Sequence, residues 1–351
     1  MDNGSTAQIQ AYYNQDDASQ VGLREALETF DLQAQQDFTV WNIHRIVWGV
    51  EGRMWQDRLV SSQAFFFAKP NSTITLANGF AQDEIALLPD LKLTLGIKGE
   101  YNSYSGFDPL PNLRLAWQVD DHSLLWGAVS RAVRTPSRID RELQGGGILI
   151  PAPNFQSEKL TAYELGFRAQ PLDRLSVSIA TFYNVYDDIR TDNSVSSTAV
   201  IPVRLGNGLT GTSYGVEAWA TYNVFDWWRL KPGMSALTEH YHLKPGNTDI
   251  TQFQALGQDP HYQAQLRSEM NVSPTVELDL ALRQVGRPAH SLLAAYTEAD
   301  ARIGWHMTNA LELSLEGLNL LHPQHQEVAD PAAFPGREIP RSVMVRLRAG
   351  F

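Results

Sequence analysis

The chain has 351 residues, a net charge of −11 and no cysteine. That length exceeds one ordinary globular core but fits a single large β-barrel. The lack of cysteine excludes disulfides, zinc–thiolate sites and cysteine nucleophiles, and an acidic chain without a lysine or arginine run argues against a nucleic-acid partner. No apolar run approaches the ~20 residues of a membrane helix, which excludes helical spans but not membrane strands that show lipid at every second residue.

The chain begins with residues 1–10 (MDNGSTAQIQ), which have neither a basic segment nor an apolar core and so are not a secretory signal peptide. Residues 24–32 could form a helix by composition, but they precede a tight turn and a further strand, so we predict a strand. Alternating apolar and polar residues predict about sixteen strands in the whole chain. The clearest of them are residues 91–97, 175–185, 276–282 and 311–315.

The predicted connections between strands alternate between short and long. The short ones are residues 36–42, 88–90, 119–122, 171–174, 225–226, 273–275 and 307–310, and the long ones are 55–73, 134–159, 188–210, 243–260, 287–295 and 321–341. A two-sheet sandwich has no reason to sort its loops in this way, whereas an outer-membrane barrel has short periplasmic turns and long outside loops. The pattern therefore predicts an all-β, antiparallel transmembrane barrel with both termini on the short-turn side.

Four arginines surround the longest predicted loop: Arg131, Arg134, Arg138 and Arg141. The planar fork of an arginine suits carboxylate, phosphate or catecholate oxygens, which an iron–siderophore complex presents. The alternative is that these arginines balance the nearby Asp140, Glu142 and Glu158. Both interpretations are open at this stage.

Two carboxylates, Glu164 and Glu217, lie on predicted strands beside the apolar Leu165 and Val216. If those neighbours face lipid, the alternation points both carboxylates into the lumen. A carboxylate at lipid depth would cost on the order of a few kcal/mol, which favours the inward direction. They either pair with lumen arginines and hold the wall together or contact a substrate.

Imidazole and phenol groups gather at the two ends of one predicted outside loop. His240, Tyr241 and His242 end one strand, and His261 and Tyr262 begin the next. Such groups can ligate haem iron or a transition metal. Nothing in the sequence fixes a third ligand, however, so we predict neither a metal site nor a cofactor. The five residues stay candidates for ligand binding at the outer rim, with solvated loop side chains as the alternative.

The last predicted strand, residues 342–351, carries aliphatic side chains on one face and two arginines on the other, and it ends on Phe351. A soluble strand would alternate as well, but here the chain stops on an aromatic residue without a polar tail. Motifs of the common hydrolases, P-loop proteins, zinc proteases and dinucleotide-binding enzymes are absent from the sequence, so we predict no enzyme.

Five stretches together resemble TonB-dependent outer-membrane receptors. They are residues 128–140 (AVSRAVRTPSRID), 154–167 (NFQSEKLTAYELGF), 207–217 (NGLTGTSYGVE), 316–320 (EGLNL) and 339–351 (IPRSVMVRLRAGF). In that family a strand bearing Ser-Arg leads into an Arg-x-Pro turn, and the next strand re-enters the membrane with a Glu-x-x-x-x-Tyr-Glu-x-Gly pattern. The order and spacing of the five stretches cover most of the chain.

The resemblance implies that residues 1–351 form the C-terminal portion of one receptor barrel, with about sixteen of the ~22 strands of a plugged transporter. It implies that the plug domain, the TonB-contacting box and the first strands are missing. It also implies energised uptake of a scarce ligand such as a ferric siderophore, a place among outer-membrane lipid, TonB as partner only in the intact receptor, and Phe351 as the signal read by the barrel-assembly machinery.

Two other functions are open on the sequence. A complete passive porin also has sixteen strands. A soluble secreted β protein that binds or cleaves glycans would have loops without alternation and a pair of lumen carboxylates at fixed spacing, and the sequence shows neither. Because an open sheet of sixteen strands exposes two unpaired edges, we expect this chain alone to be inactive and not to refold to a stable monomer in detergent.

Overall fold

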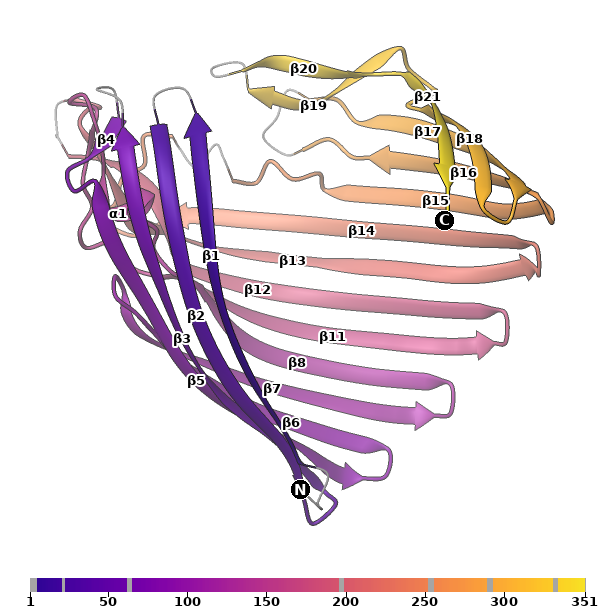
Figure 1. Ribbon diagram of the computed structural model, residues 1–351, viewed down its shortest axis with the longest axis horizontal. Coiled ribbons are helices and arrows are strands. Elements are labelled where there is room, and N and C mark those ends of the chain that lie inside the picture. The colour runs from indigo at the N-terminus through magenta and orange to yellow at the C-terminus, as the bar shows by residue number, and fades with distance from the viewer. Residues whose placement is uncertain are drawn as a thin grey trace.

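The computed structural model describes residues 5–20, 23–61, 65–195, 199–251, 256–288, 293–330 and 334–350. Sixteen strands form its wall (Figure 1). These wall strands are β1 (Thr6–Gln20), β2 (Leu23–Val40), β3 (His44–Ser61), β5 (Asn71–Leu88), β6 (Leu91–Asn102), β7 (Gly106–Asp120), β8 (Ser123–Arg134), β11 (Glu158–Leu172), β12 (Leu175–Ser194), β13 (Val203–Phe225), β14 (Trp228–Leu243), β15 (Tyr262–Ser273), β16 (Val276–Val285), β17 (Tyr296–Thr308), β18 (Leu311–Leu318) and β21 (Ser342–Ala349). The remaining elements are β4 (Phe65–Phe67), α1 (Arg138–Glu142), β9 (Leu143–Gly145), β10 (Leu149–Ile150), β19 (Gln324–Asp330) and β20 (Phe334–Pro340).

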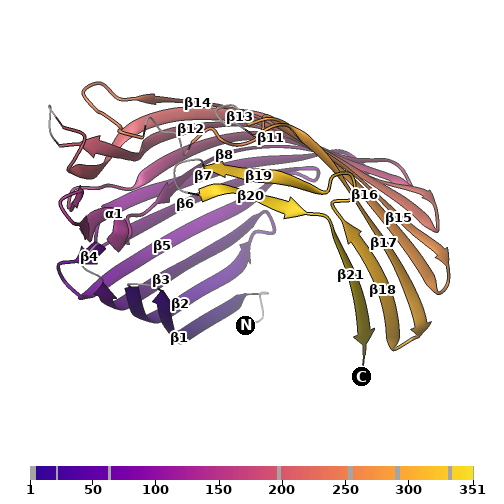
Figure 2. The same ribbon diagram turned by 90° about the horizontal axis from the view of Figure 1, so that it is seen from above.

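Each wall strand pairs antiparallel with the next one along the chain. With the short β4, β9 and β10 they make a nineteen-stranded sheet, and β19 and β20 form a separate hairpin. The sheet curves strongly but does not close, because no pairing joins β1 to β21 in the described part of the chain (Figure 2). The predicted all-β antiparallel class and the number of strands are confirmed.

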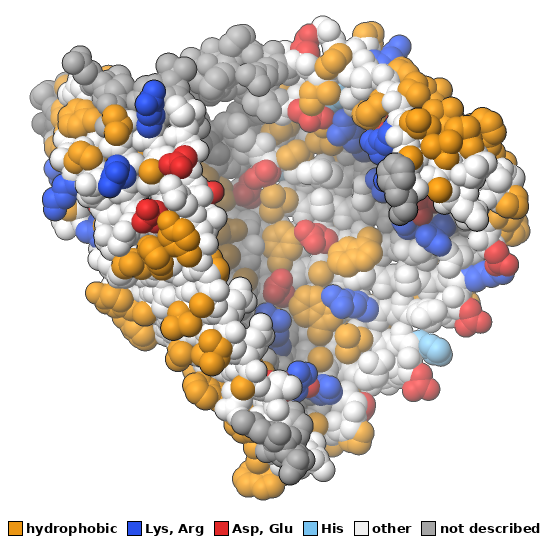
Figure 3. Space-filling view, in the orientation of Figure 1, with side chains coloured by type: hydrophobic (Ala, Val, Ile, Leu, Met, Phe, Trp, Pro, Cys, Tyr) orange, Lys and Arg blue, Asp and Glu red, His pale blue; other side chains and the backbone are white. Residues whose placement is uncertain are grey.

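The two faces of the wall differ in polarity, as alternation requires. One cross-strand row, the apolar face, contains Leu113, Val129, Tyr163, Tyr183 and Tyr214. The neighbouring row, on the polar face, contains Asn112, Ser130, Ala162, Asn184 and Ser213. Figure 3 looks into the hollow of the sheet, where Lys, Arg, Asp and Glu side chains are visible, while apolar side chains cover the outside of the strands at its margins. The polar face is therefore the concave one.

Ion pairs bind neighbouring strands together on the polar face. Arg302 lies 3.0 Å from both Glu277 and Asp279, and Arg346 lies 3.5 Å from Glu316. Charged side chains in a membrane wall avoid lipid by facing the interior and pairing there. The alternation along each strand thus separates a surface suited to lipid from a charged lumen.

Several predicted loop boundaries are wrong. Strand β3 continues to Ser61 within the predicted loop 55–73, strands β12 and β13 extend into 188–210, and the hairpin β19–β20 occupies 321–341. These extensions contain apolar residues such as Leu59, Val60 and Val203, but polar residues interrupt the regular apolar repeat that marks a strand. The alternation of loop lengths also fails at two connections at the end of the sheet that carries the long loops. Only two residues separate β1 from β2, and residues 103–105 between β6 and β7 form a short turn.

The two ends of the described chain lie near short turns, since Thr6 pairs with Asp37 and Ala349 pairs with Leu311. Phe351 lies outside the described residues. No helix in the described ranges is long and apolar enough to cross a membrane.

Candidate functional site

The connection from β8 to β11 begins with a sharp break in strand pairing. Pro136 has no backbone N–H for the ladder, so pairing ends there. Ser137 then starts the short helix α1, because its hydroxyl accepts from the backbone N–H of Asp140 while the Asp140 carboxylate accepts from the backbone of Ser137. The helix places Asp140 above the end of β8.

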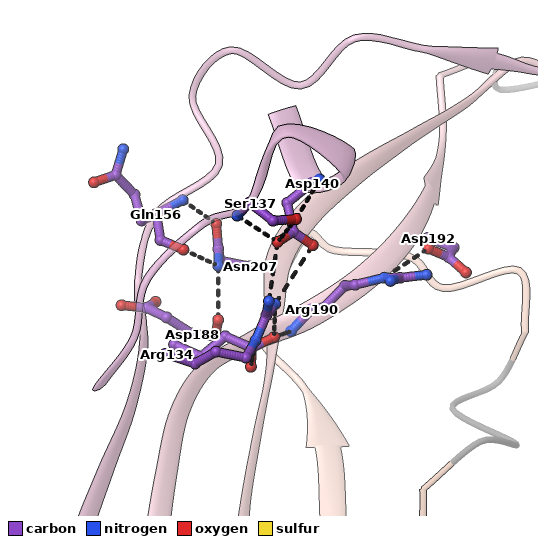
Figure 4. Close-up of polar contacts among 9 residues, drawn as sticks. Arg134, Ser137, Asp140, Gln156, Asp188, Arg190, Asp192 and Asn207 are labelled. Atoms are coloured by element: carbon purple, nitrogen blue, oxygen red, sulfur yellow. Dashed lines mark hydrogen bonds and ion pairs between the residues drawn. The ribbon is translucent and has the colours of Figure 1, made fainter. Parts of the chain in front are cut away.

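Arg134, the last residue of β8, holds this connection to the neighbouring strand (Figure 4). Its Nε donates to Glu158 at 2.6 Å, and its Nη1 donates to Asp140 at 2.9 Å. Glu158 in turn accepts from the backbone N–H of Arg190 at 2.8 Å. A guanidinium with two carboxylate partners has little capacity left for a ligand.

Asn207 closes the same connection at its far end. Its amide nitrogen donates to the carbonyls of Gln156 at 3.0 Å and Asp188 at 2.7 Å, and its oxygen accepts from the Gln156 N–H at 2.8 Å (Figure 4). These bonds fasten the segment before β11 to β12 and β13. The connection is therefore tied down at both ends.

Arg138 joins this connection to the loop between β3 and β5. Its side chain is 5 % exposed and donates to Asp57 at 3.1 Å, to Glu142, and to the carbonyls of Lys69 and Pro70. It also lies 4.7 Å from the ring centre of Phe67. Beside it, β4 pairs with β9. We call this assembly of two connections, residues 65–70 and 135–157, the loop brace.

The four predicted arginines separate into two groups. Arg134, Arg138 and Arg141 belong to the loop brace, where Arg141 donates to the Tyr104 carbonyl and stacks on the Tyr104 ring. Arg131 pairs with Thr161 and shares the apolar face with Val129, so it points away from the other three. The contacts of Arg134 and Arg138 with Asp140, Glu158 and Glu142 are the charge balance considered as the alternative to ligand binding.

The acidity of Asp140 provides a test of the loop brace. Burial alone would raise its pKa, but hydrogen bonds from Arg134 and Ser137 outweigh burial and hold the pKa below the ordinary value of 3.8. A depressed folded pKa stabilises the folded form above the unfolded pKa, and that contribution is lost as the pH falls through the folded pKa. We expect protease resistance of residues 135–157 to fall below about pH 4. In Asp140→Asn this acid step should be absent, and an unchanged acid step there would contradict the assignment.

The polar face contains a cavity of 760 Å³ where β13 to β17 meet the loops of the same end. Glu217, Trp219, Arg283, Tyr296 and Glu327 are among its lining residues. The Arg283 guanidinium lies 5.6 Å from the Tyr296 ring centre, and its Nη2 lies 3.2 Å from Glu327. A cavity of this size with a few polar groups is what a small-molecule ligand requires.

The arginine and tyrosine of this cavity were not predicted as site residues from the sequence. In the sequence, Arg283 directly follows the predicted strand 276–282, and Tyr296 directly follows the predicted loop 287–295. Their proximity depends on the pairing of β16 with β17, in which Val285 lies opposite Tyr296. The alternation could have assigned Arg283 to the lumen, but not to a cavity.

The predicted histidine and tyrosine residues do not converge. His240 lies opposite Thr212, with its ring 6.1 Å from that of Tyr214, and His242 lies opposite Thr210, so both belong to the outward row. Tyr241 points the other way. It donates to Glu239 at 2.8 Å, and its ring lies 6.2 Å from the Tyr186 ring.

Of the other two predicted residues, His261 accepts the Leu237 N–H through its carbonyl, and Tyr262 pairs with Ala236 on the apolar face. Within the described ranges, no group of three or more His, Cys, Asp or Glu residues is arranged to hold a metal ion.

Glu164 and Glu217 lie on the polar face, opposite Ala128 and Ser235 respectively. Neither makes a salt bridge in the described part of the chain, and Glu217 lines the 760 Å³ cavity. Neither glutamate therefore forms the ion pair with a lumen arginine that was one of the two roles considered from the sequence.

Comparison with known proteins agrees with this architecture. Residues 1–320 match the family described as TonB dependent receptor-like, beta-barrel. An iron-regulated outer membrane virulence protein of Vibrio cholerae is 25% identical over 152 residues, which are 41% of this chain and 23% of that protein.

Solved structures show the same fold. The siderophore receptor PirA of Pseudomonas aeruginosa matches with a TM-score of 0.74 and 14% identity over 98% of this chain and 61% of its own. The ferric enterobactin receptor PfeA of the same species, in complex with enterobactin, matches with a TM-score of 0.77 and 14% identity. The match covers 99% of this chain and 60% of that protein. The copper transporter OprC matches with a TM-score of 0.76 and 14% identity, over 98% of this chain and 63% of that protein. The chain thus spans about three fifths of these proteins. From its two-faced wall and the match over residues 1–320, the chain belongs to the TonB-dependent receptor-like β-barrel family of outer-membrane proteins.

Proposed function

We propose that this chain forms part of the wall of an outer-membrane receptor that takes up a ferric siderophore, and that the 760 Å³ cavity on the polar face contributes to the ligand site. The supporting observation is the set of groups at that cavity, in which Arg283 lies against Tyr296 and Trp219 is a further aromatic lining residue. Siderophores present anionic oxygens and flat rings, which arginine and aromatic side chains bind. The PfeA structure with enterobactin supports this ligand class.

Arg283→Ala should weaken uptake of a ferric tricatecholate about 10- to 100-fold, because a hydrogen bond to a charged group contributes about 1.5–3 kcal/mol. The measurement is the uptake of radioactive iron by cells that express the intact receptor containing these residues. Arg267→Ala is the matched control, since Arg267 lies on the polar face of the adjacent β15 but does not line the cavity. Equal uptake by the two variants would exclude this cavity as the ligand site.

We infer further that these residues do not transport alone. Strands β1 and β21 each have one edge without a pairing partner among the described residues, and unpaired backbone groups are costly in lipid. Additional strands would close the wall, and TonB would then act on the intact receptor. The barrel-assembly machinery would read the C-terminal strand that ends in Phe351.

The passive porin is the competing function, and the sixteen wall strands favour it while the unpaired β1 and β21 oppose it. The purified 351-residue chain distinguishes the two. We expect no heat-modifiable monomer on a gel and no steady conductance in a planar bilayer. A stable monomer with steady conductance would instead establish a closed porin-like barrel.

A further inference from the structure

The hairpin formed by β19 and β20 supplies one side of the 760 Å³ cavity. Figure 2 shows this hairpin on the hollow side of the sheet. Gln326 and Glu327 of β19 line the cavity together with Arg283 of β16 and Tyr296 of β17. In the described part of the chain β19 and β20 pair only with each other, so no strand pairing joins the hairpin to the wall. Side-chain contacts therefore decide how the hairpin lies against the cavity.

One carboxylate of the hairpin, Glu327, contacts both wall residues that we assign to the ligand. Its Oε1 accepts from the Tyr296 hydroxyl at 3.0 Å and lies 3.2 Å from the Arg283 guanidinium. The same oxygen lies 2.9 Å from Nε2 of His325. The position of Glu327 therefore determines where Arg283 and Tyr296 point. Its contacts also determine how much of the guanidinium charge remains for a ligand.

His325 lies between Glu327 and a second, fully buried carboxylate, Glu298. The His325 side chain is 6 % exposed, its ring centre lies 4.6 Å from that of Tyr296, and its Nδ1 lies 3.4 Å from Glu298. A neutral imidazole has one N–H and can donate to only one of two carboxylates, whereas an imidazolium can donate to both. Histidine is the side chain that ordinarily changes charge between pH 5 and 8. We call Glu298, His325 and Glu327 the histidine bridge.

The other groups around the histidine bridge come from three elements. In the loop before β19, the half-exposed His322 places its Nδ1 2.7 Å from Glu298. On β17, Asp300 accepts from a backbone N–H of the same loop at 2.8 Å, and on β20 the residue opposite the bridging histidine is the uncharged Ile339. Among the described residues, the guanidinium in contact with the bridge is that of Arg283. A proton on the bridging imidazole therefore brings two carboxylates and one guanidinium closer to neutrality.

We propose that His325 is a positioning residue of the ligand cavity and that its protonation strengthens the binding of an anionic ligand there. This inference rests on the proposed role of the cavity in the ligand site. An imidazolium between Glu298 and Glu327 holds the hairpin against β17 and shares the Glu327 charge, which leaves more of the Arg283 guanidinium to the ligand. It also adds a positive charge beside the anion. A ligand that binds the protonated form better is bound more tightly at low pH, because the coupling between proton and ligand is reciprocal.

The test is equilibrium binding of a ferric tricatecholate to the purified intact receptor that contains this chain, followed by quenching of tryptophan fluorescence at about pH 6.5 and about pH 8. The quantity compared is the affinity at the lower pH divided by that at the higher pH. This ratio should be at least about fivefold larger in the wild type than in His325→Gln, which keeps one donor toward Glu327 but cannot take up a proton. Glu298→Gln removes one partner of the imidazolium at almost unchanged size, and it should lower the ratio as well.

His306→Gln is the matched control, because His306 lies on β17, 2.9 Å from Glu277, and does not line the cavity. Its ratio should equal that of the wild type. A wild-type ratio in His325→Gln, with or without a uniform loss of affinity, would show a purely structural histidine and overturn the proposal. If that variant does not fold, a wild-type ratio in Glu298→Gln overturns it instead. A wild-type receptor that binds no tricatecholate at either pH would refute the proposed function as well, whereas binding with unchanged ratios refutes this inference alone.

Discussion

Replacing Leu165 by arginine is expected to prevent folded protein from accumulating in the outer membrane, whereas arginine at the adjacent Glu164 should be tolerated. Leu165 is 56 % exposed on the apolar face, and Glu164 lies on the polar face of the same strand. An arginine on the lipid face of a barrel costs about 2–4 kcal/mol near the membrane centre, which is ~30- to 1,000-fold in the folding equilibrium. On the lumen side the same side chain stays in water.

The measurement is the amount of receptor in purified outer membranes, quantified for both variants against the wild type. Both variants introduce an arginine, and they do so at adjacent positions of the same strand. The two introduced side chains therefore differ in the face of the wall to which they point. A soluble glycan-binding protein would tolerate arginine at Leu165, because replacing a water-exposed apolar side chain by a charged one does not destabilise the folded state. Equal levels of the two variants would therefore contradict the assignment of the faces.

Arg138→Ala is expected to release the loop brace. The substitution leaves the Asp57 carboxylate, 8 % exposed, without its guanidinium partner, and breaking a buried ion pair in this way costs about 3–5 kcal/mol. The released segment would be residues 135–157, because Arg138 connects it to the carbonyls of Lys69 and Pro70. Limited proteolysis of intact cells should then cut these residues, while the wall strands stay protected.

Two variants control for this effect. Arg174→Ala removes an ion pair with Asp226, whose side chain is 92 % exposed, and should change stability by no more than about 1 kcal/mol. The double variant Arg138→Met with Asp57→Leu replaces the buried ion pair by apolar groups and should recover most of the protection, because the buried Asp57 carboxylate is gone and Glu142 still accepts from the Tyr104 hydroxyl. Cleavage of Arg138→Ala no faster than that of Arg174→Ala would show that Arg138 does not hold the loops.

The sequence alone was sufficient to predict the wall. In residues 175–185 and 276–282 the apolar side chains recur at every second position, and this repeat requires only that one face meets an apolar medium and the other does not. The same rule could have separated Arg131 from Arg134, because positions three apart on a strand lie on opposite faces. The strand ends at Ser61 and Ser194 escaped prediction because apolar residues there do not recur at every second position.

The candidate sites required the tertiary structure. Arg138 meets Asp57 from 81 residues away, and Arg283 meets Tyr296 only after β16 and β17 pair in one register. Sequence identified Arg138 as a charged residue near a loop, but a charge alone does not specify its partner. Local alternation determines which way each side chain points, because it depends on the strand itself. Which groups come together depends on strand register and loop packing, and these are properties of the whole sheet.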